Sequence, residues 1–141
     1  MATTSTAHTH WEGALTDGAG TVDLRTSGAA TFDVRWSARA EEGQGTTNAE
    51  ELIAAALSTC YSMALSHALA GKGTPPASLD TTVDVSFQPG VGITGAHVTV
   101  VGSVPGITAD DFRAAADDTL DNCPVSKALA GIKKTLDVEF R

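Results

Sequence analysis

The sequence predicts a single α+β domain, and three observations indicate it. Apolar and polar residues alternate as in strands both before residue 40 and after residue 80. Between these regions lies a stretch of twenty residues, 52–71, without Asp, Glu, Lys or Arg. Strands and helices do not alternate regularly, as they would in a doubly wound sheet. At 141 residues the chain has the size of one domain, 1–141, with one core.

The first forty residues are expected to form strands. Alternation begins around Trp11 and Leu15 and returns in TFDVRWSAR, residues 31–39. In the second segment the apolar side chains point one way, whereas Arg35 and, if the strand continues that far, Arg39 point the other way. This strand would then have a polar face that carries two arginines.

A helix start is predicted after the glycine-rich loop EEGQGT. Thr47 or Asn48 can cap the helix, and Glu50 and Glu51 fall in its first turn, where the helix dipole and a capping box favour acids. The helix is expected to continue to about Gly71. It would be ~30 Å long, about the width of the whole domain.

This helix is long enough to span a bilayer, so a membrane span was weighed against a buried helix. The stretch is rich in Ala and Ser, contains His67, and lacks flanking basic residues and an aromatic belt. We therefore expect a helix buried on most sides and no membrane association. A chain with 5% aromatic residues has too few large side chains to cover every face of this helix. We therefore also expect a homodimer with an apolar interface near the helix.

The remaining elements are two strands, two helices and a last strand. The strands are expected at 82–87 and 96–104. Thr108 would cap the next helix, and Cys123-Pro124 would open a short helix through about Gly131. The inward face of the first of these helices would consist of Phe112, Ala115, Ala116 and Leu120, and its exposed side of Asp117, Asp118 and Asp121. Residues 135–140 would close the chain as a strand with Leu136, Val138 and Phe140 inward.

Charge and the N-terminal residues limit the function classes. The net charge is −8 with only nine Lys and Arg, which argues against nucleic acid and against anionic membrane surfaces as partners. Residues 1–13 have neither the basic start nor the apolar segment of a secretory signal, so we expect a cytoplasmic protein. In that compartment the two cysteines would be a free pair, a metal pair or a redox pair.

The two cysteines occupy different environments in the predicted fold. Cys123, at the cap of a helix, would face free N–H groups and the positive end of the dipole, which favour thiolate; it could also be a small residue at a helix junction. Cys60 lies in the middle of the long helix, where a cysteine is usually inert packing. To be reactive it needs a cation, and Arg35, Arg39 or His67 could supply one, a guanidinium being the stronger choice.

Two segments carry a family resemblance. The segments TNAEELIAAALSTCYSMALSHAL (47–69) and CPVSKAL (123–129) resemble the signature segments of the OsmC/Ohr family of osmotically inducible and organic hydroperoxide resistance proteins. HWEG (10–13) followed by GTVDL resembles the start of the OsmC branch. The resemblance implies an antiparallel sheet wrapped around a long central helix in an intertwined homodimer.

The resemblance also implies a thiol-dependent peroxidase that reduces organic hydroperoxides. It places the peroxidatic cysteine at Cys60, the resolving cysteine at Cys123 and the helix-start glutamate at Glu50. The family's arginine matches Arg39 best; this chain has Asn-Ala-Glu where the family often has Asn-Pro-Glu, and an altered loop length leaves Arg35 as the alternative. The implied reductant is a dithiol of the lipoyl type or similar, and no metal or organic cofactor is implied.

Three other functions are compatible with parts of the sequence. The first is a small-molecule or lipid-binding module with structural cysteines. The second is an acyl-transfer enzyme using Cys60 and His67, for which the sequence shows no local cysteine-hydrolase motif and no orienting acid. The third is metal binding by His8, His10, His97 and the cysteines, whose spacing matches no zinc pattern.

Overall fold

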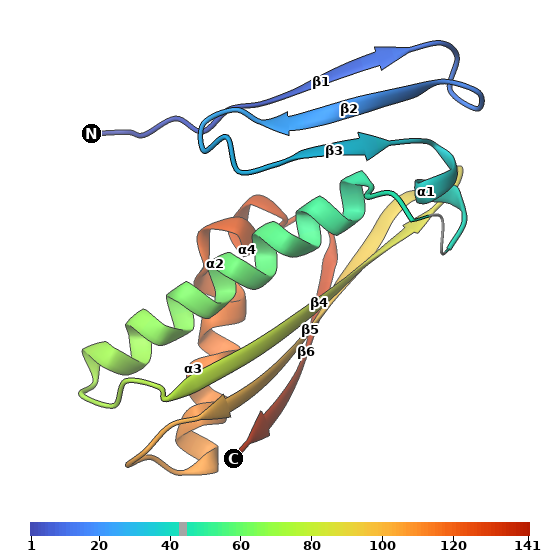
Figure 1. Cartoon of the computed structure of the whole chain (residues 1–141). Helices are drawn as coiled ribbons and strands as arrows, with labels where there is room; N and C mark the ends of the chain where they lie inside the picture. The colour runs from blue at the N-terminus through green and yellow to red at the C-terminus, as the bar shows by residue number, and fades with distance from the viewer. Residues whose placement is uncertain (43–44) are drawn as a thin grey trace. The chain divides into compact units, whose positions relative to one another are not determined.

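The structure, a computed structural model, describes residues 1–42 and 45–141, so Gly43 and Gln44 of the expected glycine-rich loop lie outside it (Figure 1). Two three-stranded sheets and four helices are found within these residues, which confirms the α+β prediction. The chain forms two compact units, Met1–Leu52 and Ile53–Arg141. The single-domain expectation stays a prediction.

The first unit contains an antiparallel sheet in the order β1-β2-β3. Its strands are β1 (Ala7–Glu12), β2 (Ala19–Leu24) and β3 (Thr31–Val34). The expectation that the last strand could reach Arg39 is wrong. The carbonyl of Trp36 accepts the N–H groups of Arg39 at 2.9 Å and Ala40 at 3.0 Å, so the chain closes a helical turn, α1 (Ser37–Ala40), that carries Arg39.

The long helix α2 (Ala49–Gly71) has the predicted bounds. Its cap is Asn48, whose Oδ1 accepts the N–H of Glu51 at 2.8 Å. Thr47, the other candidate, donates its hydroxyl to the Glu51 carboxylate at 2.6 Å. Glu50 and Glu51 both lie in the first turn, so the acid-rich start favours the helix here as the sequence predicts.

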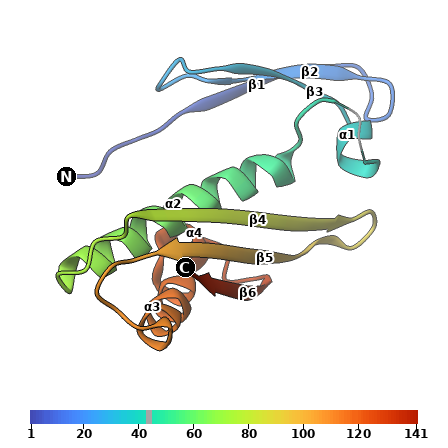
Figure 2. The ribbon, with the colours of Figure 1, turned by 60° about the horizontal axis from the view of Figure 1, so that its bottom comes forward.

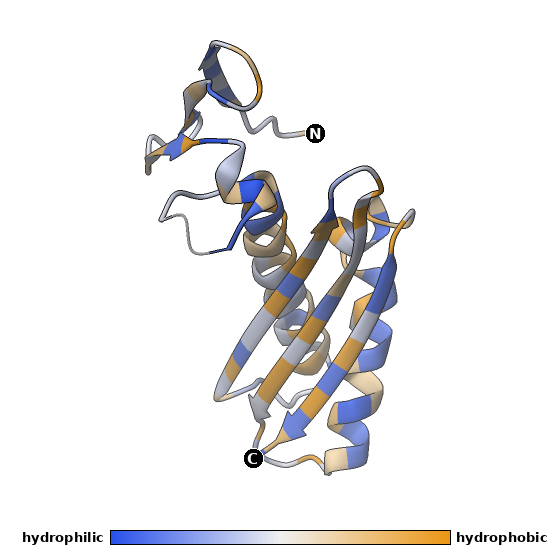
Figure 3. Cartoon of the chain, turned by 90° about the vertical axis from the view of Figure 1, so that its right-hand side faces the viewer, coloured by the Kyte–Doolittle hydropathy of each residue, from blue (hydrophilic) through white to orange (hydrophobic). Residues whose placement is uncertain are grey.

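The second unit contains the sheet β4-β5-β6, in which β4 (Ser78–Gln88) and β5 (Gly92–Ser103) are antiparallel and β5 and β6 (Lys133–Phe140) are parallel. Helix α2 and helix α3 (Ala109–Asn122) lie on the same face of this sheet (Figures 2 and 3). Side chains alternate between more and less buried along β4 and β6, and Figure 3 shows the same alternation in hydropathy. The predicted period of two is therefore confirmed.

The core of the second unit lies between this sheet and the two helices. Its members include Leu57, Tyr61, Leu65 and Leu69 of α2, Val98 and Val100 of β5, and Phe112, Ala115 and Ala116 of α3. Gly102 of β5 lies directly against the Phe112 ring, so closely that a Cβ at this position would collide with it. The glycine is therefore a packing requirement of this core.

In the single chain α2 is buried on one side only, and its burial on most sides with the help of a second copy stays a prediction. One stripe, from Leu57 to Leu69, is buried, whereas Thr59, Met63 and His67 on another face are exposed, Met63 to 67%. The sheet and α3 occupy one side only of the helix. In the part of the chain that the structure describes, α2 is the one helix that by length and composition could cross a membrane.

Helix α3 begins as predicted, but the short helix after it ends early. Thr108 and Asp111 form a capping box at the start of α3. The next helix, α4, spans Pro124–Ala128, so it ends three residues before the expected end at Gly131. Beyond Ala128 the backbone makes turns, with the N–H of Ala130 on the carbonyl of Lys127, and these lead directly into β6.

Candidate active site

The structure brings the two thiols together within the second unit. Cys60 lies in the middle of α2 and is half-buried, whereas Cys123 lies between α3 and α4 and is 1% exposed. Both are free cysteines; Cys60 packs against the buried cluster that contains Cys123, and it lies close enough to raise the pKa of the Cys123 thiol. Two sulfurs in such contact can form a disulfide with little movement of the chain.

Backbone hydrogen bonds at two helix ends hold Cys123 in place. Its N–H donates to the carbonyl of Thr119 at 2.9 Å and so ends α3. Its Sγ accepts the N–H of Ser126 at 3.3 Å and so caps α4, with Pro124 in the first turn. The predicted cap position is confirmed, and it explains the Cys-Pro pair, because proline lacks the N–H that the first turn leaves unpaired.

The prediction that this cap favours thiolate is wrong for Cys123. Burial raises the pKa of its thiol above the ordinary value, and the neighbouring Cys60 raises it further. The N–H groups of Ser126 and Val125 act in the opposite direction and do not compensate. Desolvation of a charged sulfur thus outweighs the helix end, and Cys123 rests as a neutral thiol.

A second pair of site residues, Arg39 and Glu50, is joined by an ion pair in the first unit. The Nε and Nη2 atoms of Arg39 each lie 2.8 Å from Oε1 of Glu50. Glu50 is 4% exposed, and its Oε2 is buried without a hydrogen-bond partner among the described residues. Within residues 1–42 and 45–141 no ion pair of Arg35 is found, so the structure selects Arg39 as the partner of Glu50.

The two pairs lie in different compact units. On α2, ten residues separate Glu50 from Cys60, which corresponds to about 15 Å of helical rise. The association of the Arg39 guanidinium with the Cys60 sulfur therefore stays a prediction, as do the catalytic roles of all four residues.

The histidines considered for other chemistry have different surroundings. His67 is exposed, and no acid that could orient it is found among its partners in the described chain. His8 lies 3.7 Å from Asp23 and His10 lies 3.1 Å from Glu12. No group of three His, Cys, Asp or Glu residues placed to hold a metal occurs in the described ranges.

Among the described residues, each unit also contains a pocket that the sequence did not indicate. In the first unit a pocket of about 260 Å³ is lined by both tryptophans, Trp11 and Trp36, together with Leu52, Arg35 and Arg39. Its side chains come from β1, the β3–α1 segment and the start of α2. These segments are far apart in sequence, so no local pattern could reveal it.

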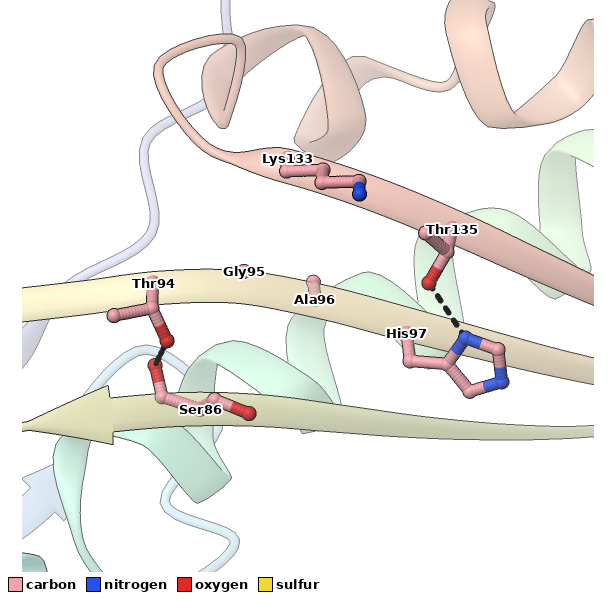
Figure 4. A pocket seen from close by; sticks show the side chains of 7 residues that line it. All are labelled: Ser86, Thr94, Gly95, Ala96, His97, Lys133 and Thr135. Carbon is pink, nitrogen blue, oxygen red and sulfur yellow. Dashed lines mark hydrogen bonds between the residues drawn. The ribbon is translucent and has the colours of Figure 1, made fainter.

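The pocket of the second unit is polar and lies on the sheet (Figure 4). It has a volume of about 240 Å³ and is lined by residues of β4, β5 and β6. The His97 ring and the Thr135 hydroxyl share a hydrogen bond of 2.6 Å, and Lys133, at the start of β6, also lines the pocket (Figure 4). Apart from the buried Ala96, the pocket residues are exposed or half-buried, as expected for the open face of a sheet.

Comparison with known proteins identifies the family. Residues 41–137 match the model of the OsmC-like protein family. The chain is 39% identical over 140 residues to peroxiredoxin OsmC of Escherichia coli K12, with 94% of this chain and 93% of that protein covered.

Solved structures agree with this. The organic hydroperoxide resistance protein OsmC of Legionella pneumophila is similar with a TM-score of 0.72, 26% identity and 97% of each chain covered. The organic hydroperoxide resistance protein OhrB of Bacillus subtilis shares the fold, with a TM-score of 0.65, 23% identity and coverage of 96% of this chain and 98% of that one. On the matched residues and the identity to its relative, this chain belongs to the OsmC family.

Proposed function

We propose that this protein is a cysteine-based peroxidase that reduces organic hydroperoxides to alcohols. The observation that carries the proposal is the contact between the half-buried Cys60 thiol and the buried Cys123 thiol. The family supports it, since relatives are named peroxiredoxin and organic hydroperoxide resistance protein. A peroxidase of this kind needs one accessible sulfur to react and a second to resolve, which these exposures provide.

The first step is oxidation of Cys60. Its thiolate attacks the terminal oxygen of the hydroperoxide, an S–O bond forms and the O–O bond breaks. The alkoxide that leaves takes up a proton and departs as alcohol, and Cys60 becomes a sulfenic acid. The sulfur loses two electrons, and the peroxide gains them.

The second step is resolution by Cys123. Its sulfur attacks the sulfur of the Cys60 sulfenic acid, an S–S bond forms and the S–O bond breaks. The hydroxide that leaves takes the proton of the Cys123 thiol and departs as water. The Cys123 thiol gives up this proton as its sulfur attacks, because the thiolate is the nucleophile.

The third step is regeneration by an external dithiol. One thiolate of the reductant attacks the Cys60–Cys123 disulfide, and its second thiol closes the reductant's own disulfide, leaving both cysteines reduced. We propose a dithiol of the lipoyl type or similar as the reductant. The electrons of the cycle thus pass only between sulfur and oxygen.

Arg39 is proposed to stabilise the Cys60 thiolate, with Glu50 fixing its guanidinium. The ion pair with Glu50 restricts Arg39 to one orientation, and a guanidinium keeps its charge at every physiological pH. We also propose a homodimer, because the exposed α2 face with Thr59, Met63 and His67 lies in a stretch without charged residues and a second copy could cover it. In such a dimer the Arg39 guanidinium of either copy can be the one that approaches Cys60. The separation of Glu50 from Cys60 along α2 is then no obstacle.

The test is to add one equivalent of an organic hydroperoxide, such as cumene hydroperoxide, to the reduced protein and map its cysteines by mass spectrometry. A Cys60–Cys123 disulfide is expected, and mixing isotope-labelled and unlabelled chains shows whether it forms within one chain, as we expect. With a dithiol present, wild-type protein should turn over and Cys60→Ser should fall to the uncatalysed rate. Without the dithiol, Cys123→Ser should stop at the sulfenic acid. Equal turnover by wild type and Cys60→Ser would instead favour a binding module with structural cysteines.

A further inference from the structure

Tyr61, the residue after Cys60, links the two cysteine-bearing helices. It is fully buried on α2, and its hydroxyl donates a hydrogen bond to the carbonyl of Ala116 on α3 at 2.8 Å. Burial, with Asp117 and Cys123 as further causes, raises the pKa of the phenol, so the group stays a donor across the physiological range. A buried carbonyl without this donor would remain unpaired on that side.

The carbonyl that Tyr61 contacts belongs to the last two turns of α3, which end in Cys123. One turn further along, the carbonyl of Thr119 accepts the N–H of Cys123 at 2.9 Å. The hydroxyl of Ser126 donates to the carbonyl of Leu120 and so ties α4 back to α3. A hydrogen bond from Tyr61 to Ala116 thus fixes the helix end from which the Cys123 sulfur projects.

We propose that Tyr61 is a positioning residue that holds the Cys123 sulfur against the Cys60 sulfur and so sets how fast the sulfenic acid is resolved. A second observation supports the proximity of these groups: Cys123 contributes to the raised pKa of the Tyr61 phenol, and Cys60, the residue before Tyr61 on α2, contributes to the raised pKa of the Cys123 thiol. The inference rests on the proposed function, because it concerns the fate of the sulfenic acid. The role proposed for Tyr61 is to position Cys123 and not to react itself.

Two reactions compete for that sulfenic acid. In the first, the Cys123 thiol forms the disulfide and water leaves. In the second, another hydroperoxide transfers an oxygen to the sulfur, which becomes a sulfinic acid while the peroxide becomes alcohol. The first reaction depends on the position of Cys123 and the second on peroxide concentration, so their ratio measures the positioning.

The experiment compares wild type, Tyr61→Phe and Ser62→Ala in the full-length protein at increasing cumene hydroperoxide, with Cys60 sulfinic acid and disulfide quantified by mass spectrometry. Tyr61→Phe removes only the donor to Ala116. Ser62→Ala is the matched control. It removes a half-buried hydrogen bond of 2.7 Å that the hydroxyl of Ser62, the next residue of α2, donates to the hydroxyl of Thr81 on β4. Thermal unfolding of each variant shows whether the two losses of stability are comparable.

We expect Tyr61→Phe to raise the ratio of sulfinic acid to disulfide about five- to tenfold, the range that the loss of one buried hydrogen bond allows. The rate of the first oxidation should stay unchanged, and Ser62→Ala should match wild type. Tyr61→4-aminophenylalanine, which keeps a donor at the same place, should restore the wild-type ratio and serves as the test if the phenylalanine variant folds poorly.

A wild-type disulfide with the same ratio in Tyr61→Phe would overturn this inference alone. An equal increase in Ser62→Ala would also overturn it, since helix stability and not the Tyr61 contact would then set the ratio. A wild-type protein that forms no disulfide at all would overturn the proposed function and this inference with it.

Discussion

The two compact units differ in how much core each builds by itself. In the second unit twelve buried residues form one cluster, and Cys123 belongs to it. In the described part of the first unit the buried hydrophobic residues are Val22 and Ala38, and Trp11 and Phe32 are each 37% exposed. The thiol pair thus rests on a core of its own, whereas the Arg39–Glu50 pair lies in a unit with little core.

This difference indicates which part of the site depends on its surroundings. The contact of the thiols is set by α2, α3 and α4, which the core of one unit fixes. The orientation of Arg39 is set by Glu50, but a unit with so little core needs other surfaces to cover its apolar side chains. We therefore expect resolution to be robust and activation of Cys60 to be the step most sensitive to assembly.

The largest expected effect comes from removing the guanidinium of Arg39. Arg39→Gln should lower the second-order rate of Cys60 with an organic hydroperoxide about 100-fold, since one electrostatic group that stabilises the reacting charge is lost. The rate constant is measured by stopped-flow under single-turnover conditions. The disulfide that finally forms should be the same as in wild type, because the thiols are positioned by the other unit.

Arg35→Gln is the matched control for this prediction. Both arginines line the same pocket, but the described residues show an ion pair with Glu50 for Arg39 alone. The rate should therefore stay near wild type in Arg35→Gln. An equal loss of rate in both variants would show that the total positive charge of the pocket activates Cys60. The ion pair with Glu50 would then not decide which arginine does so.

The sequence predicted the elements of the second unit better than those of the first. Alternation in β4 and β6 and the Thr108 cap are local signals, and the structure confirms them. The helical turn at Arg39 was missed because its stretch alternates like a strand and only the Trp36 carbonyl contacts reveal the turn. The link from Tyr61 to Ala116 spans 55 residues, so no pattern along the chain could show it.

The pKa of Cys123 is the clearest case of a local rule overruled by packing. The helix cap is visible in the sequence as Cys-Pro and was predicted correctly. The direction of the shift depends on burial by α2 and on Cys60, which only the folded chain brings near. The short range of capping interactions makes them predictable, whereas desolvation depends on every neighbour.

The next prediction concerns the core of the second unit. Gly102→Ala should lower the free energy of unfolding by about 2 to 3 kcal/mol, because the new methyl group collides with the Phe112 ring in a full core. Gly71→Ala is the control, since nothing lies within 4 Å of a Cβ there and alanine favours a helix. Urea unfolding measures both; equal stability of wild type and Gly102→Ala would show that Phe112 relocates freely.

A smaller effect is expected at alkaline pH, again in the second unit. The folded-state pKa of Cys123 is raised, so between the ordinary cysteine value of about 8.5 and the folded value the unfolded chain has already lost the proton. Stability should therefore fall as pH rises above about 8.5. Thermal unfolding of the reduced protein from pH 7 to 10 measures the slope, and Cys123→Ser should remove most of it. An unchanged slope in that variant would place the titrating group elsewhere.

The smallest effect is expected in the first unit and at the opposite end of the pH scale. A hydrogen bond from Arg25 at 2.8 Å lowers the pKa of the exposed Asp23 carboxylate, with His8 as a further cause. The folded chain thus holds this proton less tightly than the unfolded chain, so the contribution is complete above about pH 3.9 and is lost as pH falls through the lower folded value. NMR titration of the Asp23 carboxyl should give a pKa below the ordinary one, and both Arg25→Gln and 1 M salt should move it upward, because exposed pairs are screened. If salt left the pKa unchanged, the carboxylate would have to be shielded from solvent, and the first unit would then be covered on a face that is exposed in the single chain.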